Sequence, residues 1–291
     1  MKMGTLNLID NKEKHRIRDE TKKARINGPF KPILSKDGKP ILTSIWCPST
    51  EDMQEYYEVP FYAEIKLTGR TFPYVVRNLI QLYSNEGDTV YDPMMGTGTT
   101  LYEGNILKRK VFGSDLHAGR VESFKTRWAK YVSKKLPKIA LCSASEIPMP
   151  DNSVDLLIMS FPWFSSWEFA DDVTNESMDN YKELEEFMQL TEKIYTEIKR
   201  VLKPGGFACN ILGNTYRKGV YYPITMKSMG IIEKVGLKLW YQFWNMRVDI
   251  NSIKFPWNRS GIDTVVNKAG NGIAWDIHED IIVARKPGGS K

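Results

Sequence analysis

The stretch YDPMMGTGTTLYEG, residues 91–104, decides the fold. Its pattern predicts a strand that ends at Asp92, a glycine turn over residues 96–98 and a helix that begins near Thr99. This geometry brings a ligand close to bare backbone at the carboxyl edge of a parallel sheet. The turn lacks the Gly-Lys-Ser/Thr ending of an ATP-binding loop and the third glycine of a dinucleotide-binding loop. It therefore predicts a ligand site of another kind.

A second strand ends in the stretch VFGSDLH, residues 111–117, and places Asp115 at the same predicted edge. An acidic residue at the end of a second strand can accept hydrogen bonds from the two hydroxyls of a ribose. Taken alone, each feature would more readily be interpreted as an ordinary glycine turn or as a surface aspartate. Together they indicate a nucleoside-binding sheet.

Strands and helices alternate on both sides of this stretch, which is typical of crossover units and a parallel sheet. Strands are expected in DTVYDPM, KVFGSD, IALCSA, VDLLIMS and FACNILG, and helices in YVVRNLIQLY, in TTLYEGNILKR, over about 118–134 and over about 180–200.

Composition narrows the class of protein. With 291 residues and 42% hydrophobic content, the chain can bury one core with a small appendage. It lacks both a long apolar run and the apolar core of a signal peptide, so we expect a soluble, cytoplasmic protein without a membrane partner. Its cysteines are odd in number and far apart, which predicts neither a disulfide framework nor a metal site. They are Cys47, Cys142 and Cys209.

The net charge of the chain is concentrated at its beginning. Residues 1–40 hold 11 Lys/Arg and 5 Asp/Glu, a net charge of +6 that equals the charge of the whole chain. Such an arm can follow a phosphate backbone, because Lys and Arg neutralise phosphates and release counterions. A solvated, partly helical tail is the alternative. We expect residues 1–60 to form this arm and an extended approach, and residues 61–291 to form one catalytic domain.

A second informative stretch is IMSFPWFSSW, residues 158–167, where an apolar strand stops at Ser160. A hydroxyl, a proline and three aromatic rings then follow within five residues. The pattern suits a site that holds a flat, polar-edged ligand at the tip of a strand. An aromatic strand end that plugs the core is the alternative interpretation.

These motifs resemble those of DNA amino-methyltransferases. DPMMGTGTT is similar to their S-adenosylmethionine loop, and SFPWF to their catalytic motif, although Phe161 replaces a proline and Trp163 a Tyr or Phe. RVLKPGG at 200–206, HEDIIVARKP at 278–287 and TFPYVVRNLI at 71–80 resemble further segments. The resemblance implies an α/β class I methyltransferase fold, Rossmann-like, with a mostly parallel seven-stranded sheet and helices on both faces. It also implies S-adenosyl-L-methionine as the cofactor and a role in restriction-modification.

The resemblance carries a set of cofactor-binding residues over to this chain. In this set Ser143 stands where the family usually has an aspartate that holds the adenine amine, and it can accept the same hydrogen bond more weakly. The predicted cofactor residues are Thr71, Phe72, Pro73, Asp92, Pro93, Met94, Gly96, Thr97, Gly98, Thr99, Thr100, Asp115, Leu116, Ser143 and Ala144.

The predicted catalytic residues are Ser160, Phe161, Pro162 and Trp163. An exocyclic amine is a poor nucleophile because its lone pair is delocalised into the base. The Ser160 hydroxyl and the Phe161 carbonyl can accept its two N–H bonds, while Trp163 stacks on a flipped base. Methylation of carbon 5 is not expected, because that reaction needs a cysteine nucleophile in a Pro-Cys pair and this chain has only the reverse order, at Cys47-Pro48. By resemblance to the same family, serine at the head of the motif slightly favours cytosine N4 over adenine N6 as the methylated atom.

Target recognition is expected from residues 244–276, where cations alternate with aromatic rings as on a nucleic-acid-binding face. The predicted contact residues are Arg247, Lys254, Trp257, Arg259 and Lys268. Double-stranded DNA is the expected partner, with monomer and dimer both open. Two alternatives remain: a noncatalytic nucleic-acid-binding protein on a methyltransferase scaffold, and a methyltransferase that acts on RNA or on protein amides.

Overall fold

The computed structural model describes residues 45–46, 58–65, 71–162, 164, 181, 183–217, 220–246 and 278–288. The chain divides into two compact units, residues 1–43 and residues 44–291. All of the described residues lie in the second unit. The division expected at residue 60 stays a prediction, as does the role of the basic arm.

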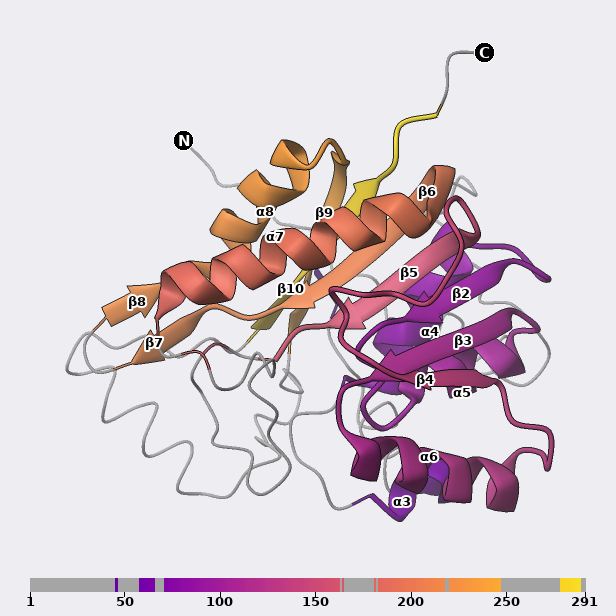
Figure 1. Ribbon diagram of the computed structural model, residues 1–291. Helices are drawn as coiled ribbons and strands as arrows, with labels where there is room; N and C mark the ends of the chain where they lie inside the picture. The colour runs from indigo at the N-terminus through magenta and orange to yellow at the C-terminus, as the bar shows by residue number, and fades with distance from the viewer. Residues whose placement is uncertain are drawn as a thin grey trace, which may run out of the picture. The chain divides into compact units, whose positions relative to one another are not determined.

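One sheet organises the second unit. Its strands run in the order β1-β9-β10-β6-β5-β2-β3-β4, and Figure 1 shows them as a continuous twisted layer. The bounds are β1 Ile45–Trp46, β2 Thr89–Asp92, β3 Lys110–Asp115, β4 Lys138–Leu141, β5 Val154–Ser160, β6 Leu202–Leu212, β9 Lys238–Met246 and β10 His278–Arg285.

Five neighbouring strands, β4, β3, β2, β5 and β6, are mutually parallel, whereas β10 runs antiparallel to both β6 and β9. The predicted mostly parallel sheet of seven strands is confirmed. The two-residue strand β1 joins it as an eighth strand, parallel to β9.

Helices cover both faces of this sheet, as predicted. The long helix α7 and the shorter α8 cross one face in Figure 1, and α4 and α5 lie behind the strands on the other. The bounds are α3 Pro60–Ala63, α4 Pro73–Tyr83, α5 Thr99–Ile106, α6 Ala118–Tyr131, α7 Leu184–Val201 and α8 Ile224–Lys234. A two-stranded hairpin of β7 (Thr215–Arg217) and β8 (Val220–Tyr222) precedes α8.

The sequence of α7 shows why these segments are helical. Phe187, Leu190, Ile194, Ile198 and Val201 are all buried, at the three- and four-residue spacing of one helix face. Acidic residues occupy the first turn and basic residues the last, which suits the helix dipole. The apolar stripe and the end charges therefore agree on a helix with one face against the sheet.

Strand β5 divides its side chains between two cores. Leu157 and Met159 pack in the core under α7 and α8, while Leu156 and Ile158 pack in the core under α4, α5 and α6. Burial on both faces is what a strand inside a parallel sheet requires. Because side chains alternate along a strand, Ser160 continues the row of Ile158, on the face of α4 and α5.

Some elements had no counterpart in the sequence patterns, namely α3, α8, β1, β9 and the β7-β8 hairpin. Strand β9 includes residues 244–246, which begin the segment expected to recognise the target. The other residues of that segment, 247–276, lie outside the described residues. Strands β2, β3, β4, β5 and β6 all reach their carboxyl ends at one edge of the sheet.

Candidate functional site

The glycine loop joins β2 to α5 and is fastened to the neighbouring strand by its backbone. The Met95 N–H donates to the carbonyl of Ser114 on β3 at 2.9 Å, and the Gly98 N–H donates to the Met95 carbonyl at 2.6 Å. Gly96 and Gly98 have φ values of +49° and +84°, in the left-handed region that favours glycine. The predicted turn is therefore present, and α5 begins at Thr99.

The two glycines serve different purposes. A Cβ on Gly98 would lie 2.1 Å from Cδ2 of the buried Phe124 ring, so packing against α6 requires glycine there. A Cβ on Gly96 would meet nothing closer than the Met94 carbonyl oxygen at 3.9 Å. Gly96 thus presents bare backbone beside open space, which is what the close approach of a ligand needs.

Asp115 ends β3 and is only 3% exposed. One of its carboxylate oxygens accepts from the Gly96 N–H at 2.8 Å, and the other accepts from the His117 N–H at 2.9 Å. The Arg120 guanidinium lies 4.0 Å away. A carboxylate has about four acceptor positions, so these bonds leave capacity for a ribose hydroxyl. Asp115 also clamps the glycine loop to the turn that begins α6.

Asp92 ends β2 directly before the loop. Its carboxyl group is buried and accepts from the Met94 N–H at 3.0 Å. Burial raises the pKa of Asp92 to about 7, although a hydrogen bond with Thr100 opposes the shift. This carboxyl group therefore changes its protonation near neutral pH.

The remaining predicted cofactor residues flank the loop. Ser143 and Ala144 follow β4, next to β3, and the Ser143 and Ser145 hydroxyls lie 2.8 Å apart. Thr71 is half-buried, whereas Phe72 and Pro73 are buried at the start of α4. Phe72 shares a core cluster with Met95 of the glycine loop. Because β2, β3 and β4 are neighbouring parallel strands, the segments 92–100, 115–116 and 143–144 lie at one edge of the sheet, while residues 71–73 begin α4, which packs against α5.

The predicted catalytic motif begins at the end of β5. Because β5 pairs directly with β2, Ser160 reaches the same sheet edge as the glycine loop. Ser160 and Pro162 are half-buried, while Phe161 and Phe164 are 4% and 1% exposed. Trp163 lies outside the described residues, as do Arg247, Lys254, Trp257, Arg259 and Lys268.

The two interpretations of this motif apply to different residues. The ring of Phe161 packs 5.8 Å from Tyr195, and that of Phe164 packs 5.2 Å from Phe187 and 5.1 Å from Tyr222, so both plug the core under α7. Ser160 and Pro162 stay at the edge. The Phe161 N–H also donates to the Ile211 carbonyl at 3.0 Å, a bond that the family's proline could not make.

Three residues near this edge had no role assigned from the sequence: Tyr74, Asn245 and Glu279. They form a buried hydrogen-bonded chain. The available signal was polar residues in apolar strand ends, at the end of β9 and in the HED that starts β10. The local sequence pattern does not indicate that Asn245 and Glu279 are linked to Tyr74.

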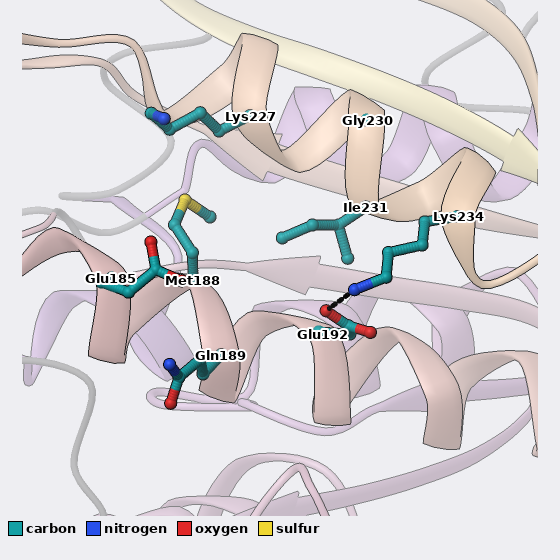
Figure 2. Close-up of a pocket in the computed structure, with 8 residues that line it drawn as sticks. All are labelled: Glu185, Met188, Gln189, Glu192, Lys227, Gly230, Ile231 and Lys234. Atoms are coloured by element: carbon teal, nitrogen blue, oxygen red, sulfur yellow. Dashed lines mark hydrogen bonds and ion pairs between the residues drawn. The ribbon is translucent and has the colours of Figure 1, made fainter.

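A groove of about 260 Å³ lies elsewhere, between α7 and α8. Figure 2 shows its lining, in which Lys234 bonds to Glu192 at 2.7 Å. The groove is lined by residues of α7 and α8 with charges of both signs, and none of the predicted site residues lines it. Within the described ranges, no group of three His, Cys, Asp or Glu residues could hold a metal ion. No helix among these residues is long and apolar enough to cross a membrane.

The strand order, the glycine loop and the acidic residue at the end of β3 have the arrangement of the class I methyltransferase fold, and the comparisons imply S-adenosylmethionine as the cofactor. A family model described as DNA methylase matches residues 5–126, which confirms the resemblance read from the motifs. No curated protein gives a significant sequence match.

Solved structures share the fold at low sequence identity. A geranyl diphosphate methyltransferase in complex with S-adenosylmethionine is 12% identical, with a TM-score of 0.51 over 74% of this chain and 84% of that chain. A geranyl diphosphate methyltransferase in complex with geranyl diphosphate and sinefungin is 12% identical, with a TM-score of 0.50 over 74% of this chain and 76% of that chain. The cyclase SpnF is 14% identical, with a TM-score of 0.52 over 85% and 100%. These matches establish the fold alone.

Proposed function

We propose that the protein is a DNA methyltransferase that transfers a methyl group from S-adenosylmethionine to an exocyclic amine of a flipped base, with cytosine N4 slightly favoured over adenine N6. The observation that supports this most is the pairing of β5 with β2. It brings Ser160 to the sheet edge that carries the glycine loop. The DNA methylase match over residues 5–126 supports DNA as the substrate.

In the proposed site, Gly96 would let the cofactor approach the backbone, and Asp115 would accept hydrogen bonds from the ribose hydroxyls of the cofactor. When bound, the cofactor would supply an electrophilic methyl group on its sulfonium and would leave as S-adenosylhomocysteine. The Ser160 Oγ and the Phe161 carbonyl accept the N–H bonds of the target amine, so that its lone pair is freed for attack. The amine becomes acidic once methylated and releases its proton without a dedicated base.

The substituted motif is compatible with this role. A backbone carbonyl survives any change of side chain, so Phe161 can still supply an acceptor. Proline would have stiffened this position through its ring. Here the same backbone is restrained by the buried ring of Phe161 and by the hydrogen bond from the Phe161 backbone N–H to the Ile211 carbonyl.

Contacts with DNA are proposed for the basic arm, residues 1–40, and for residues 247–276. Both segments lie outside the described residues, and the proposal rests on their charge and aromatic content. Deleting the arm should weaken binding equally for all DNA sequences and flatten the salt dependence, without altering which base is modified. A truncated protein with an unchanged salt slope would remove the arm from the proposal.

The deciding experiment is incubation of the protein with labelled S-adenosylmethionine and unmethylated double-stranded DNA, followed by nucleoside mass spectrometry. N4-methylcytosine or N6-methyladenine would identify the base. Parallel reactions with RNA and with protein test the other amide and amine substrates. Cofactor binding without transfer to any of them would identify a noncatalytic protein.

Two variants link the product to the catalytic motif. Ser160→Ala should lower turnover with little loss of cofactor or DNA binding, because the lost hydrogen bond strengthens as the amine rehybridises. Trp163→Ala should also weaken engagement of the base, by about 1 to 3 kcal/mol for a lost stacking ring. Trp163→Phe should recover much of that loss. Normal turnover in Ser160→Ala would exclude the proposed role of its hydroxyl.

A further inference from the structure

A buried hydrogen-bonded chain crosses from the last strand of the sheet to helix α4. The Tyr74 hydroxyl donates to Oδ1 of Asn245, and the Asn245 amide donates to Oε2 of Glu279 at 3.0 Å. Tyr74 is 7% exposed, Asn245 0% and Glu279 3%. A carboxylate in such surroundings costs free energy unless its hydrogen bonds offset the lost solvation. Its presence therefore calls for a role that an apolar side chain would not fill.

The chain of bonds lies on the sheet face that carries the site. Asn245 and Glu279 are register partners at the ends of β9 and β10, two residues beyond Phe243 and Ile281. Phe243 and Ile281 belong to the core under α4, α5 and α6. Side chains two residues apart in a strand share a face, so Glu279 lies on the face to which Ser160 points.

At its other end the chain of bonds reaches the predicted cofactor segment, residues 71–73. Tyr74 follows this segment directly, and its ring lies 5.9 Å from the ring of Phe72. Helix α4 begins there without a side-chain cap, with Pro73 in its first turn. The Tyr74 hydroxyl bond is thus a direct anchor between the start of α4 and the sheet.

We propose that Asn245 and Glu279 are positioning residues for cofactor binding, which act through Tyr74 on the segment 71–73. Glu279 fixes the orientation of the Asn245 amide, and the amide oxygen then fixes Tyr74 and the neighbouring Phe72. This inference rests on the cofactor role proposed for residues 71–73 and does not depend on the methyl acceptor.

The direction of the two bonds makes the inference testable. Asn245 must accept from Tyr74 and donate to Glu279 at the same time. Asn245→Asp keeps the acceptor but places a second carboxylate against Glu279. Adding Glu279→Gln restores the link in reverse, because the glutamine amide can donate to the new aspartate. If the hydrogen bonds position Tyr74, cofactor affinity should fall in the single variant and recover in the double variant. A change in side-chain volume would not produce this pattern, because both substitutions keep the size of the side chain.

A second buried network supplies a matched control. Asp280 on the opposite face accepts from Thr225 at 2.8 Å, from Asn214 at 3.3 Å and from Gln242 at 3.0 Å. Thr225→Val removes one of these bonds beneath α8, away from residues 71–73. Tyr83→Phe removes a hydroxyl at the other end of α4.

The experiment measures the Kd of S-adenosylhomocysteine by calorimetry, beside the melting temperature, for each variant. We expect Tyr74→Phe and Asn245→Asp to weaken binding at least tenfold, and Asn245→Asp with Glu279→Gln to return within about threefold of the original protein. Thr225→Val and Tyr83→Phe should leave the Kd unchanged.

Three results would overturn the inference: an unchanged Kd in Tyr74→Phe, no recovery in the double variant, or an equal loss in Thr225→Val. If Asn245→Asp does not fold, Tyr74→Phe decides the question, since it retains the ring. If the protein binds S-adenosylhomocysteine but methylates no DNA, the proposed function is contradicted. The Kd values of the variants can still be compared, so the inference can still be tested.

Discussion

The glycine loop after β2 and the proposed catalytic loop after β5 follow neighbouring strands at one sheet edge, yet they are held in different ways. The glycine loop is fastened by polar bonds, from the Gly96 N–H to Asp115 and from the Met95 N–H to Ser114. The catalytic loop is fastened by rings, with Phe161 and Phe164 buried under α7. The glycine loop thus leaves backbone bare at Gly96, whereas the loop after Ser160 is anchored by buried rings that follow the serine.

The difference also explains how the catalytic motif can depart from the family pattern. Where a proline would restrict the backbone, Phe161 contributes a buried ring and an N–H bond to Ile211. The glycine loop has no such freedom at Gly98, because Phe124 fills the space that a Cβ would need. Phe161 is thus held by its buried ring and a backbone bond, whereas Gly98 is held by its left-handed conformation and the close approach of Phe124.

The largest expected effect tests the apolar anchor. Phe161→Ala should lower the free energy of unfolding by about 3 to 5 kcal/mol, because it leaves a cavity beside Tyr195. The adjacent Ser160→Ala, at a half-buried position, should change it by less than about 0.5 kcal/mol. Urea unfolding of both variants measures the contrast. Equal losses would show that the two residues share one structural role and would break the comparison.

The next effect separates the two glycines. Gly98→Ala should cost about 2 to 4 kcal/mol of stability, from left-handed strain together with the clash against Phe124. Gly96→Ala should cost only about 1 to 2 kcal/mol, from the strain alone, but should weaken cofactor binding. Thermal unfolding beside calorimetric titration distinguishes them. If Gly96→Ala bound the cofactor normally, the open space beside it would not be the cofactor's.

Asp115→Ala tests the polar fastening directly. We expect S-adenosylmethionine binding to weaken by about 1 to 3 kcal/mol, the range for a lost charged acceptor. Part of this loss comes through the glycine loop, since Asp115 also accepts from the Gly96 N–H. Asp115→Asn keeps one acceptor oxygen and should lose less. Unchanged calorimetric affinity in the alanine variant would remove Asp115 from the cofactor site.

The sequence predicted the elements that carry the two loops well. Strands β3 and β5 have the bounds of KVFGSD and VDLLIMS, because each is an apolar run closed by a polar residue. Helix α8 was missed because Gly230 and scattered polar residues interrupt its apolar pattern. Strand β9 was missed because KLWYQFWNM has aromatic residues on both faces and no clean alternation.

Within the candidate site, local motifs indicated the strand-end residues but not the partners they find in space. Asp115 was expected at a ribose, whereas its bond to Gly96 depends on how β2 and β3 pair. Tyr74 and Asn245 are 171 positions apart, and only the strand order brings them together. The same limit applies to Phe161, because both a plug and a catalytic loop fit its sequence pattern.

The last effect depends on pH and concerns the buried carboxyl of Asp92, which begins the polar loop and has no counterpart in the apolar one. Burial raises its pKa to about 7, from an ordinary value near 3.8. The folded protein therefore holds a proton that the unfolded chain has already released, between about pH 4 and pH 7. Stability from this group is complete below about pH 4 and is lost as the pH rises to about 7, by up to about 1.4 kcal/mol per pH unit.

Asp92→Asn should abolish this slope, because the amide does not titrate and still offers an oxygen to the Met94 N–H. The stability of the variant relative to the original protein should rise from pH 5 to pH 7 and then stay level. Urea unfolding at pH 5, 6, 7 and 8, without cofactor, measures the difference. Ser153→Ala, which removes an exposed hydroxyl bond far from the loop, serves as the control and should show no pH trend. A difference between Asp92→Asn and the original protein that is constant across this range would mean that Asp92 is ionised in the fold, and the polar loop would then begin with a charge.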